Sequence, residues 1–365
     1  MLSRRRCIME QKPDPEQMLD QIVCPAFIVE NGIITQANIS AIQRQITAGL
    51  EVLPLLISGQ QEYREFTSGR LCLTLAVQGL TYQASVVRNN TSEIFYLESQ
   101  YINPELRAFA VASQGLREPL SNALIHADML KDGCESLLSH DCKKQLLQLV
   151  RNLHQIHRAV CNMSDASSSN KGLMSNIENR DLSATVNEII EKAQALTAKA
   201  GMTLEYTPLN KSVYCLINHD MLERAILNMI SNAFKYSTEG TAVRACLERG
   251  KGKVSFSITN QINPMEQAIG TNLFQNYLWE PNIQNANAGI GLGITIARNA
   301  ATAHGGTLLL DQPEADTVRF TLTIPVAKHS STPLRSPVIL PVDYSGGYDH
   351  ALTELSDILP SEFFE

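Results

Sequence analysis

The spacing of hydrophobic and polar positions divides the chain into segments of different kinds. Over residues 18–98, short β-rich runs alternate with turn signals. Over residues 103–163, apolar residues recur every three or four positions, which indicates amphipathic helices. After a serine-rich linker at 164–170, helix and strand patterns alternate as far as about residue 328. The pattern therefore predicts an α+β multidomain protein.

The first segment is predicted to form a small antiparallel sheet with one or two helices in its middle. Residues 26–29 run into Glu30-Asn31-Gly32, a hairpin-type turn, and residues 33–35 return from it. Further β-rich runs follow at 71–75, 82–87 and 94–97.

The second segment predicts two long helices joined by a short loop. Asn103 can cap the first helix, with Pro104 at its first position, and Asp132-Gly133 ends it. Ser139 can cap the second helix. Each helix carries one apolar stripe, and an antiparallel hairpin of this kind has one face too apolar for water. Pairing with a second copy as a four-helix bundle is therefore expected.

The third segment has the pattern of an α+β domain. Helices are predicted at about 182–200, 220–236 and 292–304, and strands near 202–207, 213–217, 242–247, 254–259, 307–310 and 318–324. Residues 328–365 are rich in Ser, Pro and Gly and are expected to be a mostly disordered tail. Within this tail, residues 351–359 have the pattern of a short amphipathic helix.

Composition narrows the function classes. The chain has 365 residues, 18% of them charged, and a formal net charge of −7, without a basic stripe, so nucleic acid is not an expected partner. No apolar run approaches the roughly 20 residues of a membrane helix, and a cytoplasmic location is expected. The 8 cysteines are scattered without a C-x-x-C pair, which favours reduced thiols over a metal or disulfide framework.

One predicted helix carries polar residues suited to a nucleotide. Asn228 and Asn232 lie one helical turn apart, at the edge of an apolar face. Their amide oxygens are ligands that Mg²⁺ accepts. Lys235 adds a positive charge for phosphates, and Tyr236 offers a ring face to a base. The alternative interpretation of such an Asn pair is a solvated polar helix edge.

A glycine-rich loop precedes the helix at 292–304. It reads Gly289-Ile290-Gly291-Leu292-Gly293. Glycines let backbone N–H groups approach phosphate closely, and the helix N-terminus behind them favours anions. The spacing matches neither the dinucleotide fingerprint nor the P-loop.

Two further stretches complete the pattern. The strand at 255–260 ends in the polar Asn260, and His304-Gly305-Gly306 turns the last helix into a strand. His304 is interpreted as a capping or packing residue rather than a base.

Taken in this order, these stretches resemble the ATP-binding domain of sensor histidine kinases, within the GHKL ATPase superfamily. The resemblance covers about residues 181–325. It implies ATP and Mg²⁺ as cofactors, with Asn232 as the metal ligand and Asn228 on the phosphate side. Lys235 would meet the phosphates, and Tyr236 would lie against the adenine.

The resemblance extends to the lid of that domain. Gly289, Gly291 and Gly293, with Leu292 among them, would form the hinge between lid and helix over the triphosphate. Phe274 is similar to the phenylalanine of the family's lid, and Thr317 to a threonine near the end of the domain.

One position departs from the family pattern at the adenine. The family has an Asp followed by glycines, whereas this chain has Asn260-Gln261-Ile262-Asn263-Pro264. An amide oxygen still accepts a hydrogen bond from the adenine amino group. Replacing a charged acceptor with a neutral one weakens that bond by roughly 1 kcal/mol, so lowered affinity is expected.

The hairpin resembles the dimerisation and phosphotransfer domain of the same family. Residues 109–120 are similar to the pattern F-x-x-x-S-H-E-L-R-T-P-L, with Gln114 in place of the phosphate-accepting His. Gly115 replaces the acidic residue and Glu118 the Thr or Asn of the reverse reaction. An amide nitrogen is not a useful nucleophile, because its lone pair is delocalised. The resemblance therefore implies a hairpin without self-phosphorylation.

Other histidines of the hairpin are not expected to replace Gln114. His126, His154 and His157 are interpreted as surface or packing residues. Ahead of the hairpin, residues 21–29 with Gly32 and Asn38 are similar to the opening strands of a PAS sensor domain.

These expectations combine into a domain plan and a function. The plan is a PAS-like sensor at 17–99, a hairpin at 103–165, an ATP-binding domain at 179–327 and a tail at 328–365. The function is cytoplasmic signal transduction by a degenerate sensor histidine kinase that binds ATP and Mg²⁺. One alternative is an active kinase that phosphorylates a nonstandard residue or a partner in trans. The other is a dimeric scaffold without nucleotide.

The expected partners follow from the same resemblance. They are a second copy of the chain or an intact kinase in a heterodimer, and a response regulator.

Overall fold

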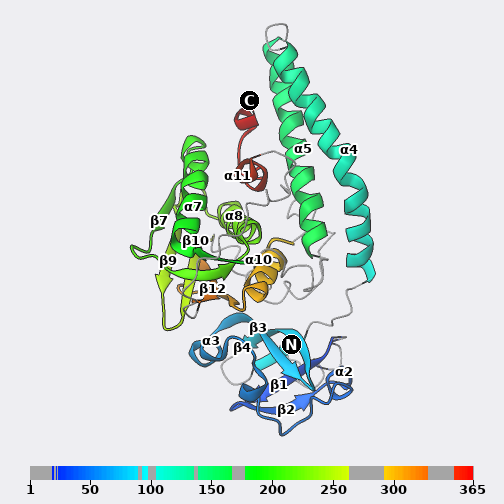
Figure 1. Cartoon of the computed structure of the whole chain (residues 1–365), viewed down its shortest axis with the longest axis vertical. Helices are drawn as coiled ribbons and strands as arrows, with labels where there is room; N and C mark the ends of the chain where they lie inside the picture. Colours follow the sequence, from blue (N-terminus) through cyan, green and yellow to red (C-terminus); the bar gives the residue numbers. More distant parts are fainter. Residues whose placement is uncertain are drawn as a thin grey trace, which may run out of the picture.

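Three bodies and one short segment make up the structure (Figure 1). The computed structural model describes Leu19, Ile22 and residues 24–88, 93–97, 104–134, 139–166, 177–262, 292–327 and 349–364. An N-terminal unit lies at one end of the molecule, an α+β domain lies in the middle, and a long helical hairpin runs alongside that domain.

The N-terminal unit is built on a five-stranded antiparallel sheet. Its strands are β1 (Ala26–Glu30), β2 (Ile33–Ala37), β3 (Gly69–Val77), β4 (Leu80–Arg88) and β5 (Glu93–Leu97), in the order β2-β1-β5-β4-β3. The expected turn lies between β1 and β2, where Asn31 and Gly32 both have positive φ. Between β2 and β3 lie α2 (Ile39–Ile42), η1 (Leu53–Leu55) and α3 (Gln60–Glu65).

The core of this unit is aromatic and aliphatic. Phe27 and Phe95 are fully buried and stack with ring centroids 4.8 Å apart. Asn38 holds the segment before β1 against this core. Its Oδ1 accepts from Ala26 N, and its Nδ2 donates to the carbonyls of Ile22 and Cys24. The sheet with small helices in its middle agrees with the sequence pattern.

The hairpin consists of α4 (Pro104–Cys134) and α5 (His140–Ala166), which pack against each other. Ser139 caps α5 as expected, since its Oγ accepts from Cys142 N at 3.3 Å. The buried stripe of α4 includes Leu120, Leu124 and Ala127. Large apolar side chains between 49% and 64% exposed remain on the hairpin: Leu116, Ile125, Met129, Leu130, Leu149 and Ile156.

The α+β domain consists of a sheet and three long helices. The strands are β7 (Leu204–Thr207), β9 (Val243–Arg249), β10 (Lys253–Gln261), β12 (Thr317–Pro325) and β11 (Thr307–Asp311), in that spatial order. A separate pair joins β6 (Glu178–Asp181) to β8 (Tyr214–Ile217). The helices are α7 (Leu182–Lys199), α8 (His219–Lys235) and α10 (Leu292–Ala303). Every helix and strand predicted for this domain is present, with bounds shifted by a few residues at most.

The sheet of the α+β domain continues into the N-terminal unit, which the sequence did not predict. Strand β3 pairs antiparallel with β11, so that Cys72 lies opposite Leu308 in one ten-stranded sheet. The two edges come so close that a Cβ at Gly69 would lie 2.3 Å from Leu310 O. An ion pair between Lys253 and Glu62, at 3.2 Å, closes the same junction.

Residues 349–364 differ from the expectation of a mostly disordered tail. They form α11 (His350–Glu354) and η3 (Ser361–Phe364), which pack against the hairpin and the α+β domain. The physical reason is burial, since Leu355, Leu359 and Phe364 are at most 2% exposed in the same core as α7 and α8. The remainder of the predicted tail, 328–348, lies outside the described residues.

The helices and cysteines of the described part of the chain bear on membrane insertion and disulfide bonding. No helix there combines the length and the apolar character of a membrane span. Cys24, Cys72, Cys142, Cys161, Cys215 and Cys246 are free thiols.

Candidate nucleotide site

Helix α8 is buried along almost its whole length, and this burial fixes the positions of Asn228 and Asn232. Asn218 caps the helix, because its Oδ1 accepts from Met221 N at 3.1 Å. Leu222, Ile226 and Ile230 anchor it in the core of the α+β domain. With the helix fixed in this way, Asn228 is 1% exposed, and Asn232 is half-buried one turn later.

Helix α10 brings Gly293 against both amides. A Cβ at residue 293 would lie 2.7 Å from Asn232 Nδ2 and 3.4 Å from Asn228 Oδ1. Only glycine allows the first turn of α10 to approach α8 so closely. The structure thus joins the two sequence motifs at one place, next to a helix N-terminus that favours anions.

Most of the predicted glycine loop and lid lies outside the part of the chain that the structure describes. Gly289, Gly291 and Phe274 lie outside the described residues. Leu292 begins α10, and its side chain is not described.

Lys235 and Tyr236 stand at the end of α8. The Lys235 ammonium lies 5.9 Å from the Tyr236 ring centroid, within the range of a cation–π contact. Both side chains are partly exposed, so charge and ring face are accessible from outside the domain.

Asn260 occupies the buried face of β10. It alternates inward with Val254, Phe256 and Ile258, and it is 3% exposed. Its Nδ2 has no hydrogen-bond partner among the described residues. An unsatisfied buried amide costs about 1–3 kcal/mol, so this position favours a ligand that accepts a hydrogen bond.

The end of β10 lies beside the end of α8. Thr238 N donates to Gln261 O at 2.9 Å, two residues beyond Tyr236 in the chain. This bond brings Asn260 and Tyr236 to the same end of the domain.

Asn228 belongs to a buried polar cluster that the sequence did not predict. Asn228 Oδ1 accepts from Arg158 Nη2 at 3.0 Å, and its Nδ2 donates to Glu354 Oε2 at 2.9 Å. Arg224 Nε also bonds Glu354, at 3.1 Å. Arg158 belongs to α5 and Glu354 to α11, 70 and 126 residues from Asn228. No local sequence signal connects residues that far apart.

His304 has the structural role that the sequence indicated. Its Nε2 accepts from Asn218 N at 2.9 Å, while its Nδ1 lies 2.6 Å from Ala300 O. Nδ1 must carry the proton in this arrangement. Burial lowers the pKa of His304, which keeps the ring neutral. His304 thus holds the cap of α8, while Thr317 closes a turn by bonding Glu314.

The hairpin residues singled out in the sequence differ in their exposure. Gln114 lies within α4, and its side chain is not described; Gly115 and Glu118 are exposed. His126 is exposed, whereas His154 and His157 are each 3% exposed. The interpretation of these histidines as surface or packing residues agrees with this placement.

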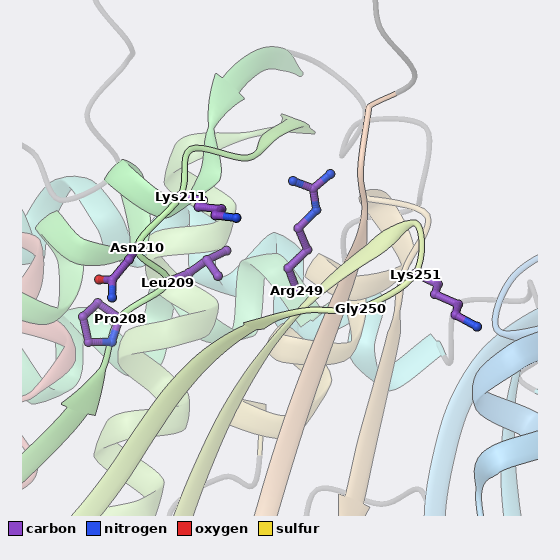
Figure 2. Close-up of a pocket in the computed structure, with 7 residues that line it drawn as sticks. All are labelled: Pro208, Leu209, Asn210, Lys211, Arg249, Gly250 and Lys251. Carbon is purple, nitrogen blue, oxygen red and sulfur yellow. The ribbon is translucent and has the colours of Figure 1, made fainter.

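A hollow lies at the other end of the sheet from the α8–α10 site (Figure 2). It has a volume of about 730 Å³ and is lined by the loop at 208–211 and the turn Arg249-Gly250-Lys251. Lys211 and Arg249 point toward each other across it, and Lys251 points away. It lies at the start of β10, whereas Asn260 lies near the end of that strand, so it is separate from the α8–α10 site.

Comparison with known proteins defines the class of the α+β domain. Residues 217–328 match the family described as "Histidine kinase-, DNA gyrase B-, and HSP90-like ATPase". That range contains α8, β10 and α10, and hence Asn228, Asn232 and Gly293. The chain therefore carries an ATPase domain of this family.

The relatives are histidine kinases and sensor proteins. The chain is 26% identical over 303 residues to hybrid signal transduction histidine kinase D of Dictyostelium discoideum, covering 79% of this chain and 19% of that protein. It is 31% identical over 199 residues to the probable sensor protein PcoS of Escherichia coli, covering 54% and 42%. The resemblance to the histidine kinase family is thereby confirmed, and the chain spans less than half the length of either relative.

Solved structures include histidine kinases as well. Full-length ShkA in complex with AMPPNP matches with a TM-score of 0.45 and 20% identity. That match covers 63% of this chain and 47% of ShkA.

Proposed function

We propose that this protein acts in histidine kinase-type signal transduction, binds ATP with Mg²⁺ between α8 and α10, and does not phosphorylate itself. The observation that carries the proposal is the contact of Gly293 with Asn232 and Asn228. It joins two motifs of the ATPase family at a helix N-terminus suited to phosphate.

The residues present fit Mg²⁺ and ATP. Asn232 supplies an amide oxygen, a ligand type that Mg²⁺ accepts together with substrate phosphates. The missing Cβ at Gly293 leaves backbone next to that amide. Asn260 keeps a buried N–H without a described partner. When bound, Mg–ATP supplies a phosphoryl group for transfer, and Lys235 would stabilise its charge.

The residues of the hairpin do not favour phosphoryl transfer to this chain. Gln114 stands where the resemblance requires a nucleophilic imidazole, and an amide does not attack phosphorus. Gly115 and Glu118, both exposed, lack the groups expected for the forward and reverse reactions. His154 and His157 are buried, which keeps them from a phosphate donor.

The alternative is an active kinase that phosphorylates a nonstandard residue or a partner in trans. Retention of Asn232, Lys235 and Gly293 favours it, because a site kept for binding is also equipped for transfer. The remaining alternative is a dimeric scaffold that binds no nucleotide. A measurement of ATP binding distinguishes it from the other two functions.

The other parts of the chain complete the proposal. The exposed apolar residues of the hairpin, Ile125 and Met129 among them, favour pairing with a second copy or with an intact kinase. The five-stranded sheet of the N-terminal unit supports a PAS-like sensor at 17–99. We further propose a cytoplasmic location and a response regulator as the downstream partner.

The test is incubation of the purified chain with γ-labelled ATP and Mg²⁺, alongside a binding titration. We expect ATP binding that is lost in Asn232→Ala, and no label on the protein. Acid-labile, base-stable label that disappears in Asn232→Ala would establish phosphohistidine and replace the proposal with the active kinase. Absence of binding in a folded sample would leave the scaffold.

A further inference from the structure

Residues 349–364 lie between the hairpin and the α+β domain, with α11 beside both α5 and α8 (Figure 1). Leu355 and Leu359 are fully buried, in one core with residues of α7 and α8. Phe364 packs on His154 of α5, with ring centroids 5.1 Å apart. The segment therefore shares its apolar contacts between the hairpin and the α+β domain, beside the direct packing of α5 on α10.

Polar contacts fasten the same segment to α5. Arg151 donates to Ser356 O at 3.2 Å, and Gln155 donates to the same carbonyl at 3.2 Å. His154 Nδ1 lies 3.1 Å from Thr353 Oγ1. These bonds orient the segment along the hairpin.

The centre of the contact is a buried charge cluster. Glu354 is 0% exposed, and its carboxylate accepts from Arg158 of α5 and Arg224 of α8, each at 3.1 Å. Arg158 also bonds Asp357 at 2.6 Å. A carboxylate at such a depth is stable only while its cationic partners stay in place, so the three elements are held as one unit.

This cluster uses both polar atoms of Asn228. Its oxygen is bonded to Arg158 and its nitrogen to Glu354, and a Cβ at residue 293 would lie 3.4 Å from that oxygen. Asn228 therefore cannot turn to a phosphate or its metal without breaking bonds to α5 and α11. A triphosphate arriving here would also compete with Glu354 for the guanidinium groups, since Arg binds phosphate bidentately.

We propose that residues 349–364 form an autoinhibitory latch that holds the hairpin on the ATPase domain and is released by nucleotide. The proposal rests on the proposed function. Docking of the latch lowers nucleotide affinity, and by linkage nucleotide lowers the affinity of the latch for its groove. Release removes the contacts through which α11 joins α5 to α8, which makes the hairpin the element that reports nucleotide binding.

The test compares two release variants with a matched control in the full-length chain. Glu354→Gln removes the charge at the centre of the cluster, and Leu359→Asp undocks the segment without touching Asn228. Glu362→Gln makes the same chemical change as the first variant at an exposed position of the same segment. Hydrogen exchange of β9, β10 and β12 shows whether each variant keeps the ATPase domain folded.

Two readouts are measured: hydrogen exchange over α5 and 349–364, and affinity for a fluorescent ATP analogue with Mg²⁺. We expect both release variants to exchange faster in these segments without nucleotide and to bind the analogue about tenfold more tightly. Saturating ATP should speed the same exchange in the wild-type chain, and Glu362→Gln should behave like wild type.

The outcomes separate the latch from the nucleotide function. If the wild-type chain binds ATP but exchange over 349–364 slows or stays unchanged, the latch is overturned while the proposed function stands. Release variants that bind no more tightly overturn it as well. If neither wild type nor a release variant binds nucleotide, the proposed function itself fails. Binding that appears only in the release variants supports the latch in its strongest form.

Discussion

Residue 293 illustrates how a single missing side chain positions a site. The backbone of Gly293 meets the side chains of Asn232 and Asn228 in a space that no Cβ can share. A glycine inside a helix lowers helix stability, by about 1 kcal/mol relative to alanine. The close approach of α10 to α8 offsets this cost, because it places the helix N-terminus over two amides.

Gly293→Ala is expected to weaken ATP binding about tenfold, because the new Cβ would push Asn232 away from the proposed metal position. A titration with a fluorescent ATP analogue and Mg²⁺ measures the change. Gly115→Ala is the matched control, since that helical glycine has open space around it. Equal affinity of Gly293→Ala and wild type would show that nucleotide does not contact this turn.

Asn260→Asp is expected to strengthen ATP binding about fivefold, because a charged acceptor improves a hydrogen bond to the adenine amino group by roughly 1 kcal/mol. The same change should lower the melting temperature without nucleotide, since it buries a charge. Gln261→Glu, at the half-buried neighbouring position, should do neither. Weaker ATP binding in Asn260→Asp would show instead that the base accepts a hydrogen bond from Asn260 Nδ2, the atom without a described partner.

At the scale of elements, α5 connects the hairpin to the rest of the molecule. It packs on α4, α10, α11 and η3. His154 lies in the middle of these contacts, where burial and then the neighbouring His157 lower its pKa to about 4. Lys131 of α4 acts in the same direction, while Asp128 and Asp349 oppose it.

The pKa of His154 predicts a loss of stability on acidification. Between its ordinary pKa of 6.5 and about 4, the unfolded chain binds a proton that the folded chain does not. Stability is therefore highest above about pH 6.5 and falls as the pH drops toward about 4. Thermal melting at about pH 7.5 and about pH 5 measures the effect. His154→Gln should show a smaller drop than wild type, and His126→Gln, at an exposed position, an unchanged one. Equal drops in all three would assign the pH dependence to other groups.

The whole molecule is joined by the sheet as well as by the latch. Pairing of β3 with β11 makes the N-terminal unit continuous with the ATPase domain. Lys253 and Glu62 form an ion pair there in which both side chains are only 17% exposed. A change in the N-terminal unit therefore has a direct route to the domain that carries Asn232, besides the route through the hairpin.

Gly69→Ala is expected to open this junction, since its Cβ would lie 2.3 Å from Leu310 O on the neighbouring strand. Small-angle scattering should show a larger radius of gyration, and limited proteolysis should release the N-terminal unit. Gly79→Ala is the matched control, because Gly79 also has positive φ but has open space around its Cβ position. Equal expansion in both variants would attribute the effect to backbone strain.

The sequence by itself determined the local structure and most of the residues of the proposed site. Periodicity predicted α7, α8 and α10, because a buried helix face imposes its spacing on the chain. Residue chemistry singled out Asn228, Asn232 and Gly293, since their roles depend on positions within one turn or one loop. Turn residues such as Asn31-Gly32 fixed the first hairpin for the same reason.

Only the tertiary structure decided what these elements touch. The bonds of Asn228 to Arg158 and Glu354, the pairing of β3 with β11, and the burial of Leu355 and Leu359 all join residues far apart in the chain. In the sequence, the charged residues look like surface charges, β3 looks like any strand, and residues 355 and 359 belong to a short apolar pattern. Such contacts depend on packing across the whole molecule. A short-range pattern of residues does not predict them, because the partners are far apart in the chain.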